Sequence, residues 1–327
     1  MGEMSYREAL NLALKEEMRR DVRVMVLGEE VAMYQGVYKV TQGLLAEFGN
    51  KRVKDTPISE EIIVGAATGA AMGGVRPVAE LMTMNFALLA MDQIVNNTAK
   101  LHYMFGGQTK VPMVIRIPQG AGKQLGAQHS QHLEAYFMHC PGLRVVMPSN
   151  PADAKGLLKS SIRDENPVIF IEDQGLYSTV GEVPEGEYVL PLGKANIIKS
   201  GEDLTIISYS RMLLDCIEAA IELEKYNIKA EVIDLRCLNP LDKKTIIDSV
   251  NKTGLAIVAN EAWMTGSAGA EIASLIMENC FESLDAPVIR ISAKDIPMPY
   301  NKELEQAALP HKDDIVKTAL YLLQGNQ

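Results

Sequence analysis

The sequence lacks the features that mark membrane and secreted proteins. No stretch reaches the roughly 18 consecutive apolar residues that a bilayer-spanning helix requires. The first residues, MGEMSYREAL, contain no apolar core of the kind found in signal peptides. We therefore expect a protein that neither spans a membrane nor is exported.

Paired cysteines are also absent. The chain has Cys140, Cys216, Cys237 and Cys280, and no two of them form a C-x-x-C pair. This spacing argues against a zinc site, an iron–sulfur cluster and a disulfide framework. Scattered thiols of this kind fit reduced side chains, so the expected location is cytoplasmic.

Positive charge is in deficit. Lysine and arginine number 32 against 42 aspartate and glutamate, which gives a formal net charge of −10. Because an acidic chain repels a phosphate backbone, nucleic acid is not an expected partner. The 327 residues, 47% of them hydrophobic and 23% charged, have the composition of a globular protein with room for two domains.

The common phosphate-binding motifs are missing as well. The first predicted strand ends in GEEVAMYQG instead of G-x-G-x-x-G, and G-x-x-x-x-G-K-[ST] is absent. The chain also has no G-x-S-x-G elbow of an α/β-hydrolase and no H-E-x-x-H zinc motif. This chain alone therefore has no evident means of holding a phosphorylated cofactor.

What the sequence does contain is a regular alternation of apolar runs and helical stretches. The apolar runs predict buried parallel strands at 22–28, 75–81, 111–118, 143–148 and 167–173. Helices are expected at 5–20, 59–74, 87–104, 130–138 and 151–163. This order predicts an α/β fold whose mostly parallel sheet is covered by helices on both faces.

The alternation stops at 181–194, where proline, glycine and acidic residues cluster. It then resumes, with strands expected at 203–210, 229–236, 255–261 and 288–293. The helices expected there are 211–226, 241–253, 267–282 and one from about 313. We therefore predict two α/β domains, 1–185 and 186–327.

Two adjacent acids precede a glycine-rich helix in DTPISEEIIVGAATGAAMGG, residues 55–74. Ser59 suits a helix cap, which places Glu60 and Glu61 in the first turn. They could simply favour the helix dipole, or one carboxyl could serve a ligand. Glycines at 65, 69 and 73 fall on one helix face and weaken the helix, which predicts close approach by another helix in a subunit or domain contact.

Two further stretches are candidates for a site. Met82 and Phe86 follow a predicted strand, where α/β proteins place ligand loops, although plain core packing is the usual explanation of apolar residues at this spacing. The glycine-rich loop at 120–126 leads to His129 and His132, which are expected to enter a helix. Either imidazole could carry protons near neutral pH, or one could cap the helix while the other faces solvent.

A third candidate lies at SIRDENP, residues 161–167. A helix is expected to end there at Asp164. Carbonyl groups released at a helix end, together with a carboxylate, can bind a hard monovalent cation, although an ordinary helix cap is the simpler interpretation.

Together these motifs resemble one family over essentially the whole chain. It is the β subunit of the thiamin-diphosphate-dependent decarboxylase component of 2-oxo acid dehydrogenase complexes. The resemblance is carried by DTPISE (55–60), RPVAELMTMNF (76–86), AQHSQ (127–131), HCPGLRVVMPSNPADAKGLLKSSIRDENPV (139–168) and DIPMPY (295–300). Within the family, DIPMPY and GVYKVTQGL (36–44) are most similar to pyruvate dehydrogenase, and AKLHYMFGG (99–107) is also similar to acetoin dehydrogenase.

The resemblance implies how the chain is organised. It implies a pyrimidine-binding first domain, a transketolase-like second domain and a heterotetramer of two α and two β chains. In the family the α subunit holds the diphosphate and Mg²⁺ through a GDG…NN signature, which this chain lacks. A dihydrolipoyl acyltransferase, with its lipoyl and subunit-binding domains, is the further implied partner, and the chain is expected to be inactive alone.

The resemblance also implies roles for individual residues. In the family the functional glutamate is followed by four residues and then by G-φ-x-x-G, where φ is apolar. Glu60 fits this register, because four residues separate it from Gly65, while Glu61 does not. Glu60 is then the proton partner of the aminopyrimidine, a role that suits a carboxyl whose charged form is disfavoured by burial. Met82 and Phe86 flank the ring, and His129 donates a proton during acyl transfer. A potassium site is implied at Met113, Ser161, Ile162, Asp164 and Asn166.

Oxidative decarboxylation of pyruvate is the favoured activity, with branched-chain 2-oxo acid and acetoin dehydrogenases as alternatives. Transketolases carry both halves of the cofactor site in one longer chain, and the missing GDG…NN signature argues against them. A scaffold without catalysis would leave DTPISE and AQHSQ unexplained.

Overall fold

The computed structural model describes residues 2–324 of the chain. It divides into two compact units. The first contains residues up to Gly120 together with Tyr136–Leu192, and the second contains Ala121–Ala135 and Gly193 onwards. Among the described residues, no helix is both long and apolar enough to cross a membrane.

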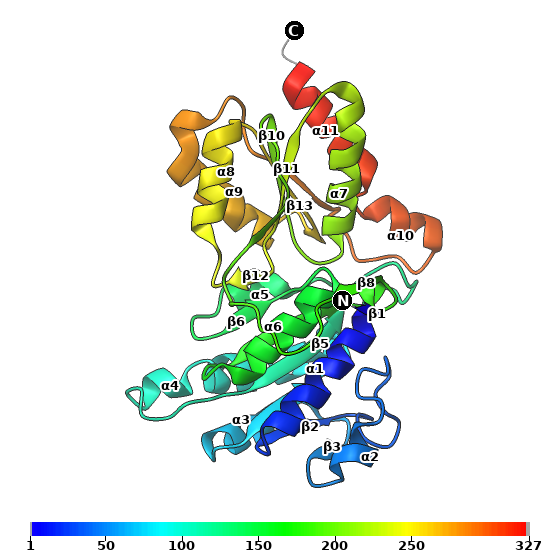
Figure 1. Cartoon of the computed structure of the whole chain (residues 1–327), viewed down its shortest axis with the longest axis vertical. Helices are drawn as coiled ribbons and strands as arrows, with labels where there is room; N and C mark the ends of the chain where they lie inside the picture. Colours follow the sequence, from blue (N-terminus) through cyan, green and yellow to red (C-terminus); the bar gives the residue numbers. More distant parts are fainter. Residues whose placement is uncertain (1, 325–327) are drawn as a thin grey trace. The chain divides into compact units, whose positions relative to one another are not determined.

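A twisted parallel sheet forms the centre of the first unit (Figure 1). Its strands lie in the order β6-β7-β5-β4-β2-β3, and each neighbouring pair is parallel. Their bounds are β2 (Val24–Gly28), β3 (Val53–Asp55), β4 (Arg76–Glu80), β5 (Val114–Gln119), β6 (Arg144–Val146) and β7 (Val168–Asp173). Apart from the edge strand β3, almost every residue of these strands is buried, as expected for a parallel sheet covered on both faces.

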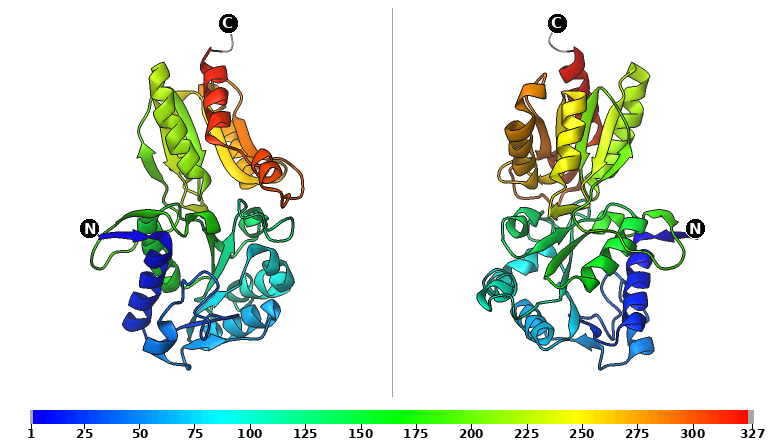
Figure 2. Two further views of the ribbon diagram at one scale, coloured as in Figure 1. Left: turned by 90° about the vertical axis from the view of Figure 1, so that its right-hand side faces the viewer. Right: turned by 60° about the vertical axis from the view of Figure 1, so that its left-hand side comes forward.

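Helices cover both faces of this sheet (Figure 2). Helices α1 (Tyr6–Arg20) and α6 (Pro151–Arg163) pack together on one face. The other face is covered by α3 (Glu60–Met72), the 3₁₀ helix η1 (Met84–Ala90) and the π-helical segment η2 (Asp92–Thr98). The remaining elements are β1 (Gly2–Ser5), α2 (Leu44–Phe48), α4 (Leu101–Met104), α5 (Glu134–Met138), η3 (Gln174–Leu176) and β8 (Val180–Val183).

Local sequence signals explain the best-predicted helices. Ser5 and Glu8 form a capping box at the start of α1, where the sequence predicts a helix. In α6 the side chain of Asn150 accepts a hydrogen bond from the backbone N–H of Asp153, and Pro151 occupies the first turn. Asp164 ends that helix, as the sequence predicts.

Two expectations about helices are wrong. The helix expected at 87–104 is three separate segments, η1, η2 and α4, of which η2 is π-helical. The helix expected at 130–138 begins only at Glu134, so His129 and His132 precede it instead of entering it. Glu134 is fully buried and accepts a hydrogen bond from the Tyr209 hydroxyl, a long-range contact that no local pattern reveals.

The second unit contains another mostly parallel sheet, in the order β14-β13-β10-β11-β9, in which only β9 is antiparallel. Helices α7 and α11 pack together, as do α8 and α9 (Figure 1). The bounds are β9 (Asn196–Lys199), β10 (Leu204–Ser208), α7 (Met212–Leu223), η4 (Glu224–Tyr226), β11 (Ala230–Asp234), β12 (Cys237–Asn239), α8 (Lys243–Thr253), β13 (Ala256–Trp263), α9 (Ala268–Cys280), η5 (Phe281–Ser283), β14 (Ile289–Ala293), α10 (Lys302–Ala308) and α11 (Lys312–Gln324). The two-domain α/β prediction is confirmed in fold class.

A buried ionic cluster joins three strands of the first sheet. Arg116 of β5 is fully buried, and its guanidinium contacts the carboxylates of Glu80 on β4 and Glu172 on β7. The Tyr177 hydroxyl donates to the Glu172 carboxylate over 2.8 Å. Burial raises the pKa of Glu80 although Arg116 opposes the shift. The two carboxylates raise the pKa of Arg116, against the effect of its own burial.

Replacing Arg116 tests how strongly the folded state depends on this cation between Glu80 and Glu172. We expect Arg116→Met to lower the free energy of unfolding by about 3–5 kcal/mol at neutral pH, because two carboxylates then lie buried without their cation. The pKa of Glu80 should rise further, so the folded chain binds a proton that the unfolded chain releases. The loss should therefore grow as pH rises from 5 to 8. Denaturant unfolding at the two pH values measures both effects.

Arg23 offers a matched control, because its ion pair with Asp21 is solvent-exposed on the arginine side. We expect Arg23→Met to cost no more than about 1 kcal/mol. Equal losses in the two variants, or a loss in Arg116→Met that does not change with pH, would contradict the assigned role.

Candidate functional site

The carboxyl ends of three neighbouring strands in the first unit lie in line. Gly28, the last residue of β2, is opposite both Asp55 of β3 and Glu80 of β4. The segments that follow these strands therefore leave the sheet at one edge. In open α/β sheets ligands bind at this edge. It is also the edge at which Glu60, Met82 and Phe86 leave the sheet.

Glu60 is the first residue of α3 and is 5% exposed, whereas its neighbour Glu61 is exposed. Ser59 holds the cap position but its side chain forms no cap hydrogen bond. Between residues 2 and 324, the Glu60 carboxyl forms no hydrogen bond or ion pair. The positive end of the helix dipole favours its charge. A buried carboxyl left without a protein partner is the kind of group that a ligand satisfies.

A second carboxyl lies near Glu60 and was not predicted from the sequence. Burial and the charges of Glu60 and Glu30 raise the pKa of Glu29. Glu29 directly follows β2, and the next turn is fixed by Asp55, whose carboxylate accepts hydrogen bonds from the backbone N–H groups of Ala32 and Met33. Its only sequence signal is its position at the end of a buried strand. Glu29 is therefore a second carboxyl close enough to Glu60 to feel its charge.

The loop after β4 completes this edge of the first unit. Leu81 donates its backbone N–H to the Arg116 carbonyl over 3.0 Å, so the buried ionic cluster also supports the start of the loop. Met82 and Phe86 are half-buried, and the Phe86 N–H donates to the Thr83 carbonyl over 3.0 Å. The hydroxyl oxygens of Thr56 and Thr83 are buried and have no hydrogen-bond partner among residues 2–324.

The carboxyl-end edge of the first sheet can be compared with the needs of the aminopyrimidine ring of thiamin diphosphate. The ring offers nitrogen atoms that pair with a carboxyl and faces that pack against Met and Phe side chains. Glu60 supplies the unpartnered carboxyl, Met82 and Phe86 supply apolar surface, and Thr56 and Thr83 supply unpaired hydroxyls. The residues present fit the group.

Gly65, Gly69 and Gly73 form the glycine stripe of α3, and the three positions differ in how closely other residues pack against them. A Cβ atom at Gly65 would lie 3.3 Å from the Gln93 side-chain oxygen, so η2 packs close to the helix there. No described residue would lie within 4 Å of a Cβ at Gly69, and Gly73 stands just past the end of the helix. The stripe is therefore no continuous helix contact within this chain. Its use at a contact with another subunit stays a prediction.

His129 belongs to the segment 121–135, which is part of the second unit. The residue is exposed, and its backbone N–H donates to the Gly126 carbonyl over 3.2 Å. Gly120, Gly122, Gln124 and Gly126 all have positive φ, so this loop needs its glycines. The structure thus confirms an accessible imidazole after a glycine-rich loop, while its place in a helix is wrong.

The residues expected to bind potassium gather at the opposite, amino-terminal edge of the first sheet. The Met113 carbonyl accepts from the Val168 N–H over 3.0 Å, which brings the start of β5 to the start of β7. The carbonyls of Ile162 and Asp164 accept hydrogen bonds from the Arg76 guanidinium over 3.1 and 3.0 Å. An ion there would share the carbonyls of Ile162 and Asp164 with the Arg76 guanidinium. The residues therefore fit a monovalent cation only in part, because two of the expected ligands already have a cationic partner.

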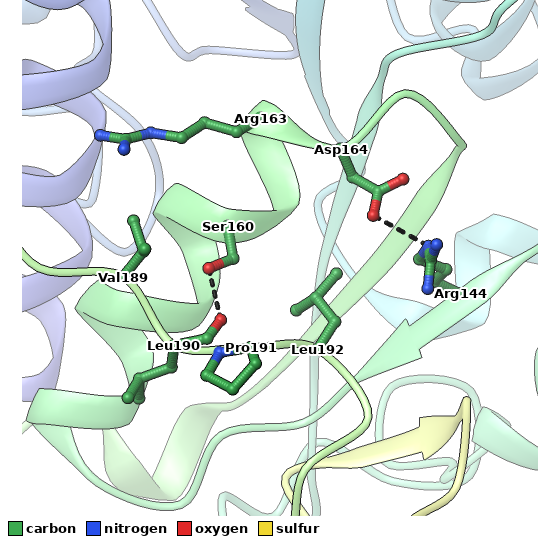
Figure 3. A pocket seen from close by; sticks show the side chains of 8 residues that line it. All are labelled: Arg144, Ser160, Arg163, Asp164, Val189, Leu190, Pro191 and Leu192. Atoms are coloured by element: carbon green, nitrogen blue, oxygen red, sulfur yellow. Dashed lines mark hydrogen bonds and ion pairs between the residues drawn. The ribbon is translucent and has the colours of Figure 1, made fainter.

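The same helix end borders an open pocket of about 500 Å³. Figure 3 shows Arg144 paired with the Asp164 carboxylate and the Ser160 hydroxyl donating to the Leu190 carbonyl. The segment 189–192 forms the other wall. This pocket lies at the end of α6, so it is separate from the edge that carries Glu60.

Comparison with known proteins defines the class. Residues 2–179 match the family model described as "Transketolase, pyrimidine binding domain", and residues 193–315 match "Transketolase, C-terminal domain". A solved structure titled "Split gene transketolase, inactive beta4 tetramer" has the same fold, with a TM-score of 0.82 over 98% of each chain at 24% identity. The chain is a two-domain α/β protein of the transketolase type.

Closer relatives carry a more specific name. The "Pyruvate dehydrogenase E1 component subunit beta" of Rhizobium meliloti (strain 1021) is 52% identical over 97% of this chain and 69% of that protein. The protein of that name from Rickettsia felis is 50% identical over 96% of this chain and 97% of its own length. The mitochondrial one of Caenorhabditis elegans is 49% identical over 96% and 91%. This chain belongs to the family of pyruvate dehydrogenase E1 component β subunits.

Proposed function

We propose that this chain is the β subunit of an acetyl-transferring pyruvate dehydrogenase, working with an α subunit and thiamin diphosphate. The observation that carries the proposal is the buried Glu60 carboxyl, which has no partner among residues 2–324 and lies at the amino end of α3. The relatives named above carry the pyruvate name, which favours pyruvate over branched-chain 2-oxo acids and acetoin.

The reaction breaks the bond between the carboxylate and the oxo carbon of pyruvate and releases CO₂. The remaining acetyl group forms a thioester with one sulfur of an oxidised lipoyl group. The lipoyl disulfide is reduced as its sulfur–sulfur bond breaks, and the second sulfur takes a proton. When bound, thiamin diphosphate supplies the carbon centre that attacks the oxo carbon and accepts the electron pair released by decarboxylation.

In this scheme Glu60 holds a ring nitrogen of the aminopyrimidine and exchanges a proton with it. Glu29 is a second carboxyl close to that proton. Its pKa is raised by burial and by the charge of Glu60. Met82 and Phe86 pack against the ring. His129 gives a proton to the lipoyl sulfur as the disulfide opens, since a thiol is a better leaving group than a thiolate.

The partners follow from what this chain lacks. We propose that the α subunit holds the diphosphate and Mg²⁺, and that two α and two β chains form the heterotetramer. Ile58, Ile62, Leu88 and Leu89 are large exposed apolar residues on and beside α3 and η1. Such a surface marks a protein contact, and we assign it to the α subunit.

The second unit would dock the dihydrolipoyl acyltransferase. Native mass spectrometry checks both assemblies: the heterotetramer when this chain is mixed with the α subunit, and the docked complex when the acyltransferase is added.

We also propose that the protein is cytoplasmic. The four cysteines are buried and no disulfide joins them among residues 2–324, which suits a reducing compartment. Cell fractionation checks it.

Substituting the two adjacent glutamates separates the proposed proton partner from a helix-dipole residue. We expect Glu60→Gln to abolish hydrogen–deuterium exchange at the thiazolium carbon of thiamin diphosphate in the assembled enzyme, because the amide cannot exchange a proton with the ring. Glu61→Gln, an exposed position one residue away, is the control and should exchange normally. Equal loss in both variants would overturn the assignment.

Removing the imidazole should interrupt acyl transfer. In His129→Ala we expect acetylation of a lipoyl domain to fall by about 10²–10⁴-fold, the range for loss of a general acid. The near- and far-ultraviolet circular dichroism should stay native, because the side chain is exposed. His139→Ala, another exposed histidine, is the control. Unchanged lipoyl acetylation in His129→Ala would remove that residue from the mechanism.

We further propose a structural potassium ion at Met113, Ser161, Ile162, Asp164 and Asn166. The support is the gathering of these residues at the end of α6, on the far edge of the sheet from Glu60. The assembled enzyme should have a higher melting temperature in KCl than in NaCl of equal ionic strength. Equal melting temperatures in the two salts would argue against the ion.

A further inference from the structure

The loop that leads to His129 is held by a buried carboxylate that no catalytic motif contains. Glu305 lies on α10 and is fully buried. Its carboxylate accepts the Gly122 backbone N–H over 2.9 Å, and the Gln124 backbone N–H lies 3.3 and 3.2 Å from its two oxygens. The Gln124 side-chain amide donates to the same carboxylate over 2.7 Å. Three donors therefore converge on one carboxylate across more than 180 residues of sequence.

No cationic side chain of the described residues accompanies this carboxylate. Among residues 2–324, Glu305 forms no ion pair, so its charge is satisfied by the loop amides alone. Hydrogen bonds to a charged acceptor are stronger than neutral ones, and a buried charge is costly when its donors are removed. The loop and Glu305 therefore stabilise one another, which is a stronger link than a surface loop normally has to its domain.

The loop conformation needs such an anchor. Gln124 is held with φ of 54°, in the left-handed region that residues with side chains seldom adopt. Gly122, two residues earlier, has φ of 90°. Just before it, Ala121 packs in a small apolar cluster with Met298 and Leu309 from the segments that flank α10. The anchored part ends at Gln124, and two residues later Gly126 accepts the His129 N–H.

Helix α10 is itself fixed at its start. The Asn301 side chain accepts hydrogen bonds from the backbone N–H groups of Glu303 and Leu304. The next residue in the helix is Glu305. Asn301 thus sets the first turn, and the first turn sets the direction of the carboxylate towards the loop.

We propose that Glu305 is a positioning residue that holds the 121–126 loop and thereby places the His129 imidazole for acyl transfer. The inference rests on the proposed role of His129. It adds that the transfer half-reaction depends on a carboxylate in the carboxyl-terminal part of the chain, through backbone amides. Glu305 itself touches neither substrate nor cofactor.

The test compares Glu305→Gln with wild type in the assembled α-containing enzyme carrying thiamin diphosphate. The amide keeps the size of the side chain but loses the charge and turns one acceptor into a donor that faces the Gln124 amide. We expect the ratio of lipoyl-domain acetylation to pyruvate decarboxylation, the latter followed with an artificial electron acceptor, to fall about tenfold or more. That factor corresponds to loss of one charge-assisted hydrogen bond. Amide hydrogen exchange in a peptide covering 121–131 should accelerate by a similar factor.

Two further variants separate positioning from general stability. Gln124→Ala removes the 2.7 Å bond without altering α10 and should lower the same ratio in part. The double variant Glu305→Gln with Gln124→Glu restores an amide–carboxylate pair with its members exchanged, and it should recover both the ratio and the slow exchange. Glu303→Gln, an exposed position on α10, is the control and should resemble wild type.

The outcomes distinguish the two proposals. If His129→Ala leaves lipoyl acetylation unchanged, the proposed role of His129 fails, while the exchange rates still report whether Glu305 holds the loop. If His129→Ala loses transfer but Glu305→Gln keeps the wild-type ratio, the positioning role is overturned. It is also overturned if Glu305→Gln lowers both half-reactions equally, or if the exchanged pair restores neither measurement.

Discussion

The ion cluster of Arg116, Glu80 and Glu172 is the interaction on which the first unit depends. It joins β4, β5 and β7 near their carboxyl ends, and the same residue, Arg116, accepts a backbone hydrogen bond from Leu81 at the start of the Met82–Phe86 loop. Buried ion clusters often add little net stability over an apolar core. We interpret this one as fixing where three strands end, because that edge has to present a carboxyl and an apolar loop to the same ligand.

The candidate site is consistent with a chain that holds only part of a cofactor. Glu60 is buried with no partner among the described residues, and the hydroxyls of Thr56 and Thr83 are in the same condition. These groups are left for a ligand to satisfy. The lack of a phosphate-binding motif and the apolar surface beside α3 agree with a second subunit that supplies the rest.

Local sequence signals account for much of the fold. Asn150, Pro151 and Asp164 mark both ends of α6, and the buried strands read as short apolar runs because both faces of a parallel sheet are covered. The structure of residues 84–104 was harder to predict. The hydrophobic pattern of a short 3₁₀ or π-helical segment does not distinguish it from an α-helix. Glu60 was selected by its register before the glycines. Glu29, Arg116 and Glu305 were missed because their roles depend on contacts with residues distant in sequence, as in the link between Glu305 and Gly122.

We interpret this chain as contributing the pyrimidine half of a site that an α subunit completes. The most direct measurement is pyruvate oxidation with an artificial electron acceptor, in the presence of thiamin diphosphate and Mg²⁺, as the α subunit is titrated into a fixed amount of this chain. We expect no turnover by this chain alone, activity that saturates at one α per β, and a higher kcat/KM for pyruvate than for 3-methyl-2-oxobutanoate or acetoin. Turnover by this chain without the α subunit would contradict this interpretation.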